Sequence, residues 1–71
     1  MTHVYTLKIW YSGEEDDVFL FRLLRDARAK VYDYFQKPRP SALTSKALDD
    51  FQEHLFSRDI GYFDIEHKEI N

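Results

Sequence analysis

The two ends of the chain alternate apolar and polar residues, whereas its middle repeats apolar residues every three or four positions. Residues 3–11 are rich in β-branched and aromatic side chains, which favour a pleated strand. Residues 60–70 alternate in a similar way and predict a second strand. Residues 14–36 and 44–57 carry apolar stripes at helical spacing and predict two helices. The sequence therefore predicts an α+β fold with the order β-α-α-β.

A helical hairpin between two strands returns the chain in the opposite direction, so we expect the strands to pair antiparallel. The expected fold is a compact β-α-α-β domain, with a two-stranded sheet covered on one face by the helical hairpin. The predicted core face of the first strand comprises Tyr5, Leu7, Ile9 and Tyr11, and Phe63, Ile65 and His67 share one face of the second strand. A two-stranded sheet is marginal in water and leaves one face and both edges open, so we expect dimerisation to complete it.

Local signals set the expected ends of the helices. Residues 12–15 have the spacing of a capping box, and acids at 14–17 suit the positive end of a helix dipole. The segment Lys37-Pro38-Arg39-Pro40 ends the first helix, because a residue before proline is pushed out of the helical region. Thr44 is the expected N-cap of the second helix.

The chain is small and lacks cysteine. Its 71 residues predict a single domain, residues 1–71, without disulfides or thiolate chemistry. Six Phe, five Tyr and one Trp exceed the needs of one small core, and exposed aromatic area is typical of an interface. The competing interpretation leaves tyrosine hydroxyls at the rim of the core. Without a signal-peptide pattern or a long apolar run, we expect a cytoplasmic protein with no membrane contact, in the host cytoplasm if a phage encodes it.

Two surfaces are candidates for protein contacts. The outer face of the sheet carries the residues that we expect in a homodimer interface, which are Val4, Lys8 and Trp10. One flank of the long helix combines aromatic residues with arginines, a composition typical of binding sites. These residues, predicted to bind a partner protein, are Phe21, Arg25, Arg28 and Tyr32. The alternative is that the rings pack on the edge of the core while the arginines extend into water.

No pattern in the chain predicts a nucleophilic or nucleotide-dependent enzyme. Only Gly13 and Gly61 are glycines, so no phosphate-binding loop or glycine-framed serine is present. Asp64, Glu66 and Lys68 share one strand face and resemble the E-x-K half of the PD-(D/E)xK nuclease motif. That resemblance implies a small Mg²⁺-dependent nuclease, in which the acids hold the metal and the lysine contacts the phosphate. The competing interpretation is a solvated strand face with alternating charge.

Histidines near both ends of the chain suggest a metal site as a further alternative. His3 and His67 fall at strand ends that meet in an antiparallel pair, and Glu69 lies nearby. Two imidazoles and a carboxylate are ligands that zinc accepts. The spacing is not that of a zinc motif, however, and His54 has no fixed relation to the pair. We expect neither a cofactor nor a metal.

Charge is distributed unevenly along the chain. Residues 22–46 hold seven basic residues and two acids, a net charge of +5, within a chain whose net charge is −3. A basic segment can contact phosphates, so a nucleic-acid-associated factor is the alternative function. No recognition motif frames the segment. We predict a small non-catalytic regulator or inhibitor, of bacterial or phage type, that masks a surface of another protein.

Overall fold

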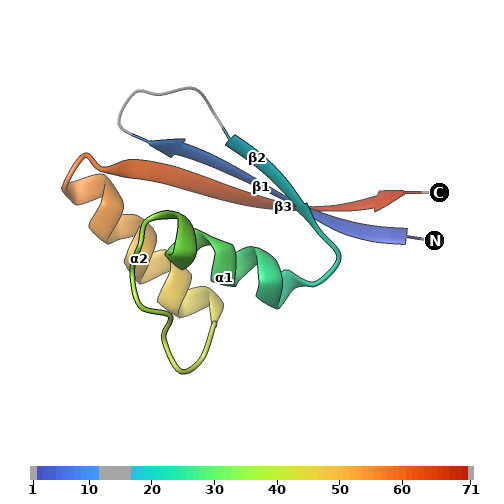
Figure 1. The fold of residues 1–71 in the computed structure, drawn as a ribbon, viewed down its shortest axis with the longest axis horizontal. Coiled ribbons are helices and arrows are strands. Elements are labelled where there is room, and N and C mark those ends of the chain that lie inside the picture. The colour runs from blue at the N-terminus through green and yellow to red at the C-terminus, as the bar shows by residue number, and fades with distance from the viewer. Residues whose placement is uncertain (1, 12–16, 71) are drawn as a thin grey trace.

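The computed structural model describes residues 2–11 and 17–70, which form a sheet with two helices against it (Figure 1). The elements in these residues are β1 (Thr2–Tyr11), β2 (Asp17–Phe21), α1 (Leu24–Tyr34), α2 (Ser45–Ser57) and β3 (Gly61–Ile70). The α+β prediction is confirmed. The prediction of a two-stranded sheet is wrong, because the sheet has three strands in the order β2-β1-β3, with antiparallel neighbours.

The additional strand, β2, lies where the sequence predicted the first turns of a long helix. Its residues Val18, Phe19 and Phe21 are β-branched or aromatic, and such side chains suit a pleated surface. Phe19 pairs with Leu7 on the core side, which leaves Leu20 on the outer side with 70% of its surface exposed. Leu20 is therefore not part of the apolar stripe of a helix. The pairing gives β1 a neighbour on each side.

The ends of the helices follow the predicted signals in part. The predicted capping box falls on residues 12–15, which lie outside the described residues. Helix α1 begins after Leu23, which makes no side-chain cap hydrogen bond. Thr44 is confirmed as the N-cap of α2, since its hydroxyl oxygen accepts the N–H of Ala47 at 3.1 Å. Helix α1 ends at Tyr34, four residues before Pro38.

The core lies between one face of the sheet and the two helices, which both cover that face (Figure 1). The largest fully buried side chains there are Leu7, Ile9, Val31 and Leu55. The predicted core positions Leu7 and Ile9 are thus confirmed. Tyr11 is 44% exposed, so its prediction as a core residue is wrong; it pairs with Gly61 where the two strands end.

Gly61 occurs where β3 begins because no larger residue fits there. A Cβ atom at Gly61 would overlap the carbonyl oxygen of Trp10 and lie 3.0 Å from the Phe35 ring. Both neighbours are held in place, the first by the backbone of β1 and the second by the core. The start of β3 is therefore set by a close approach to β1. Neither helix of the described chain is long and apolar enough to cross a membrane.

Candidate protein-binding surface

The outer face of the sheet is opposite the helices and carries alternate residues of all three strands. Its central row consists of Val18, Lys8 and Asp64, side by side on β2, β1 and β3. The next row consists of Leu20, Thr6 and Glu66. Thr6 is 6% exposed, although it lies on the face opposite the helices. This face is thus a row-by-row mixture of apolar and charged groups.

Apolar side chains gather at two places on this outer face. On β2, Val18 is 55% exposed and Leu20 is 70% exposed. At the opposite corner, the rings of Trp10 and Tyr62 are in contact, with centroids 4.9 Å apart and planes inclined by 50°. Tyr62 is 40% exposed. Burial of such groups against another molecule is favourable, by about 25 cal/mol for each Å² of apolar area.

The three residues predicted for a homodimer interface lie on this outer face. Val4, Lys8 and Trp10 belong to β1, the central strand, and each is half-buried by its neighbours. The prediction of the face is therefore confirmed, whereas their role in a dimer stays a prediction. The larger exposed areas belong to Leu20 and Val18 on β2, which sequence reasoning assigned to a helix.

The four residues predicted to form a partner-binding helix flank do not share one exposed surface. Phe21 lies in β2 rather than on the helix, so that part of the prediction is wrong. Tyr32 is 6% exposed and stacks on Phe51, with ring centroids 4.7 Å apart. Burial, and secondarily the charge of Asp50, raise the pKa of Tyr32 above its usual value. The alternative interpretation, in which the rings pack on the core, fits these positions.

The two arginines of that flank have different environments. Arg28 donates from Nη1 to the carbonyl oxygen of Leu43 at 2.8 Å and so ties α1 to the segment before α2. Arg25 is exposed, and its Nε lies 3.9 Å from Oδ1 of Asp26. Exposed ion pairs contribute little, so the Arg25 pair adds little stability, whereas Arg28 stabilises the helix connection. The structure does not bring the four residues together as a site.

The predicted meeting of His3 and His67 is confirmed. Nδ1 of His3 lies 2.9 Å from Nε2 of His67, and the Tyr5 ring stacks on His67 with centroids 4.9 Å apart. In the described part of the chain, no group of three or more His, Asp or Glu side chains is placed to hold a metal ion. Structural zinc takes four ligands, and this pair supplies two. The pair acts as a cross-strand contact between β1 and β3.

Asp64, Glu66 and Lys68 lie on the outer face of β3, as predicted. Nζ of Lys68 is 3.9 Å from Oε2 of Glu66, and both side chains are about half exposed. Lys8 is the cross-strand neighbour of Asp64. Asp64 thus has Lys8 beside it across the strands, and Glu66 has Lys68 beside it along β3. These exposed pairs of opposite charge fit the solvated strand face that the sequence offered as the alternative to a nuclease.

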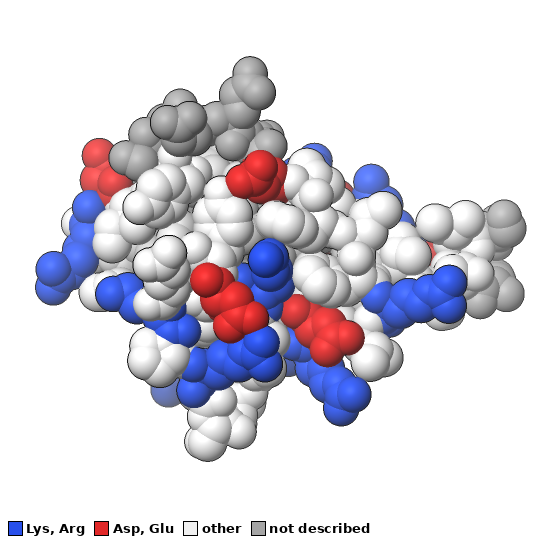
Figure 2. Space-filling view, in the orientation of Figure 1, with Lys and Arg blue, Asp and Glu red and all other residues white. Residues whose placement is uncertain are grey.

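The basic segment 22–46 makes several intramolecular contacts. Arg39 donates to both carboxylate oxygens of Asp33, at 3.0 and 2.5 Å. This hydrogen bonding holds the pKa of Asp33 below its usual value. Nζ of Lys30 lies 4.8 Å from the centre of the Phe19 ring. Figure 2 shows Lys and Arg side chains over the helices with Asp and Glu side chains between them, so the positive charge is interrupted on this side.

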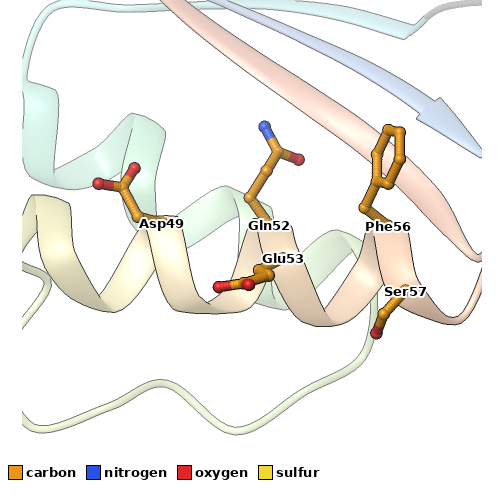
Figure 3. A pocket seen from close by; sticks show the side chains of 5 residues that line it. All are labelled: Asp49, Gln52, Glu53, Phe56 and Ser57. Carbon is orange, nitrogen blue, oxygen red and sulfur yellow. The ribbon is translucent and has the colours of Figure 1, made fainter.

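A shallow hollow runs along α2, and Gln52 connects it to the edge of β3. The hollow is lined by Asp49, Gln52, Glu53, Phe56 and Ser57. Figure 3 shows Gln52 and Phe56 extending from one side of the helix and Glu53 and Ser57 from the other. The amide of Gln52 makes two hydrogen bonds to the backbone of Phe63. Sequence reasoning missed this residue, because a polar position on a helix gives no sign of a backbone partner in a distant strand.

Comparisons of the chain with models of protein families, with curated proteins and with solved structures find no match.

Proposed function

We propose that this protein is a small regulator or inhibitor that binds another protein and masks part of its surface. The outer face of the sheet is the contact surface in this proposal, and its most exposed apolar residues are Val18 and Leu20 on β2. Binding in this way needs no catalytic group. A partner suited to this surface presents an apolar patch that contacts Leu20, and around that patch it carries charges opposite to those on β3.

The observation that carries the proposal is the exposure of Val18 and Leu20 on the face that neither helix covers. Both are held by backbone pairing with β1, so they are presented on a rigid strand rather than on a loop. Rigid presentation limits the conformational entropy lost on binding. Lys8, Asp64 and Glu66 supply a charged border, and interfaces commonly surround an apolar centre with such a polar rim.

The experiment compares capture of partner proteins by two matched variants. Leu20→Lys places a charge on β2 within the proposed contact surface, whereas Phe56→Lys places one on α2. The two wild-type side chains are equally exposed, at 70% and 71%, so each substitution removes a similar exposed apolar group. Each variant is immobilised and incubated with native lysate, and the captured proteins are identified by mass spectrometry.

We expect wild type and Phe56→Lys to retain the same protein and Leu20→Lys to lose it, with unchanged circular dichroism in all three. A loss of affinity of about tenfold or more is expected, because a charge buried in the contact is desolvated without a partner. Equal capture by the two variants would refute the proposal, and so would the absence of any protein retained by wild type over an unrelated protein of similar charge.

A further inference from the structure

The hydrogen bonds of Gln52 show which backbone groups of β3 point toward the free edge of the sheet, away from β1. The N–H of Phe63 donates to Oε1 of Gln52 at 3.1 Å, and its carbonyl oxygen accepts from Nε2 at 2.6 Å. Both backbone groups of Phe63 therefore point away from β1. Backbone groups alternate in direction along a strand, so those of Ile65, His67 and Glu69 also point away from β1.

Beyond Phe63, where Gln52 of α2 occupies it, this edge of β3 continues toward the C-terminal end of the strand. In the described part of the chain, the order β2-β1-β3 places no strand on the outer side of β3. Residues 66–70 are exposed, and they extend with the start of β1 beyond the helices (Figure 1). An edge of this kind is a template for another strand. Gln52 occupies the position of such a strand at Phe63, and the next three outward-facing residues remain available.

We propose that the β3 edge pairs with the β3 edge of a second copy of this chain, antiparallel and across a two-fold axis at His67. The two three-stranded sheets then join into one sheet of six strands, with both β3 strands at its centre. This contact is at the opposite edge of the sheet from Leu20. Glu66 belongs to both proposed contacts, but Leu20→Lys tests the regulator function without altering the β3 edge. Glu69→Pro tests the pairing of copies without changing a side chain of the outer face, so failure of one proposal is distinguishable from failure of the other.

Charge selects this register among those that a two-fold axis allows. With the axis at His67, Glu66 lies opposite Lys68 of the second copy, and the same pair occurs twice. An axis at Lys68 places two lysines directly opposite each other, which is unfavourable. An axis at Glu66 sets Asp64 opposite Lys68, but it places two Glu66 side chains opposite each other and brings Glu69 of the second copy to the Phe63 backbone, which Gln52 already holds. An axis at Ile65 sets Asp64 opposite Glu66 and requires the backbone of Phe63, which Gln52 already holds. An axis at Glu69 pairs only the last few residues.

The same register covers apolar side chains that a single copy exposes. Ile70 lies on the outer face opposite Asp64 of the second copy, and its diagonal neighbour there is Tyr62. Ile70 is 52% exposed and Tyr62 is 40% exposed in the single chain. Diagonal neighbours across an antiparallel pair are within reach of aromatic side chains. Backbone pairing, two pairs of opposite charges and two Ile–Tyr contacts thus favour the same arrangement.

The test measures mass in solution by sedimentation equilibrium over a range of protein concentrations. Wild type should show twice the mass of the 8.6 kDa chain at high concentration and dissociate on dilution. Glu66→Lys places two lysines opposite each other at two points, so it should weaken association by roughly tenfold or more. Adding Lys68→Glu to that variant restores opposite charges and should restore association.

A proline at an outward-facing position gives a second, independent variant. Glu69→Pro removes an N–H that points away from β1, so the β1–β3 ladder keeps its hydrogen bonds while the contact between copies loses two, one from each copy. We expect a monomer with the melting temperature of the monomeric wild type, and a dimer for the control Glu69→Ala. A wild type that sediments as one chain at every concentration overturns the proposal. Failure of the double charge swap to restore association also overturns it, as does a folded Glu69→Pro dimer.

Discussion

The amide of Gln52 is predicted to stabilise the fold by completing the hydrogen bonds of the β3 edge, and Gln52→Ala tests this. Gln52 is half-buried, and its amide makes both bonds that a neighbouring strand would make to Phe63. A neutral hydrogen bond contributes about 0.5–1.5 kcal/mol, so the loss of two predicts a free energy of unfolding lower by about 1–3 kcal/mol. The slightly higher helix propensity of alanine offsets only about a few tenths of a kcal/mol.

Urea unfolding followed by circular dichroism measures this loss, at one low protein concentration so that association does not contribute. Glu53→Ala is the matched control, because Glu53 is the next residue of α2 and is exposed. A loss of 1 kcal/mol lowers the melting temperature of a domain of this size by about 4–8 °C, which thermal melting resolves. Amide hydrogen exchange adds a local readout: the Phe63 N–H should exchange faster once its acceptor is gone.

A free energy of unfolding that is the same in Gln52→Ala and Glu53→Ala would refute this reasoning. It would show that water replaces the amide at the edge of β3 without cost. Unchanged exchange at Phe63 would refute it separately, because that amide would then have another acceptor. Gln52→Glu should fall between wild type and alanine, since its carboxylate still accepts the N–H but lies close to the Phe63 carbonyl oxygen.

Three further substitutions test other contacts of the fold. Gly61→Ala should lower the free energy of unfolding by about 1–3 kcal/mol, because the added Cβ meets the Trp10 carbonyl. A urea midpoint that falls no more than it does for an alanine substitution at an exposed position would contradict this prediction. Thr44→Ala should lower the free energy of unfolding by about 1 kcal/mol, because the N-cap hydrogen bond to Ala47 is lost. Thr44→Ser keeps a hydroxyl acceptor and should retain most of that stability in the same assay. Hydrogen bonding from Arg39 lowers the pKa of Asp33 in the folded protein. The stabilisation from this pair is therefore fully present above the pKa that Asp33 has in the unfolded chain, and it is lost as pH falls through the pKa that Asp33 has in the folded protein. The melting temperature of Asp33→Asn should therefore be below that of wild type near neutral pH, and the two should converge in acid. A difference in melting temperature that stays constant with pH would argue against the pairing.

The sequence predicted the elements that depend on local pattern. The strand character of residues 3–11, the N-cap at Thr44 and the burial of Leu7 and Ile9 all follow from residue type and alternation, and all are confirmed. The meeting of His3 with His67 followed from an antiparallel pairing of the chain ends. These features need no knowledge of distant neighbours beyond the order of the elements.

Strand β2 was missed because its signal is ambiguous. Leu20, Leu23 and Leu24 fit a helical stripe, whereas Val18 to Phe21 also fit a short strand. Pairing with the second side of β1 decides between them, and that is a tertiary contact. The error moved Leu20 from an expected helix interior to an exposed sheet face, so the candidate surface shifted with it. Gln52 was missed for a related reason, since its partner lies eleven residues away in another element.

The pairing of β1 with β3 also bears on how the protein folds during synthesis. Partners in this ladder are separated by 52 residues at Trp10 and Tyr62 and by 68 residues at Thr2 and Ile70. Contacts between such distant residues close large loops, which slows folding relative to helical hairpins. During synthesis, the edge of β1 that pairs with β3 has no partner strand until β3 has left the ribosome. Sheet assembly in this chain is thus expected to follow translation of β3 rather than accompany it.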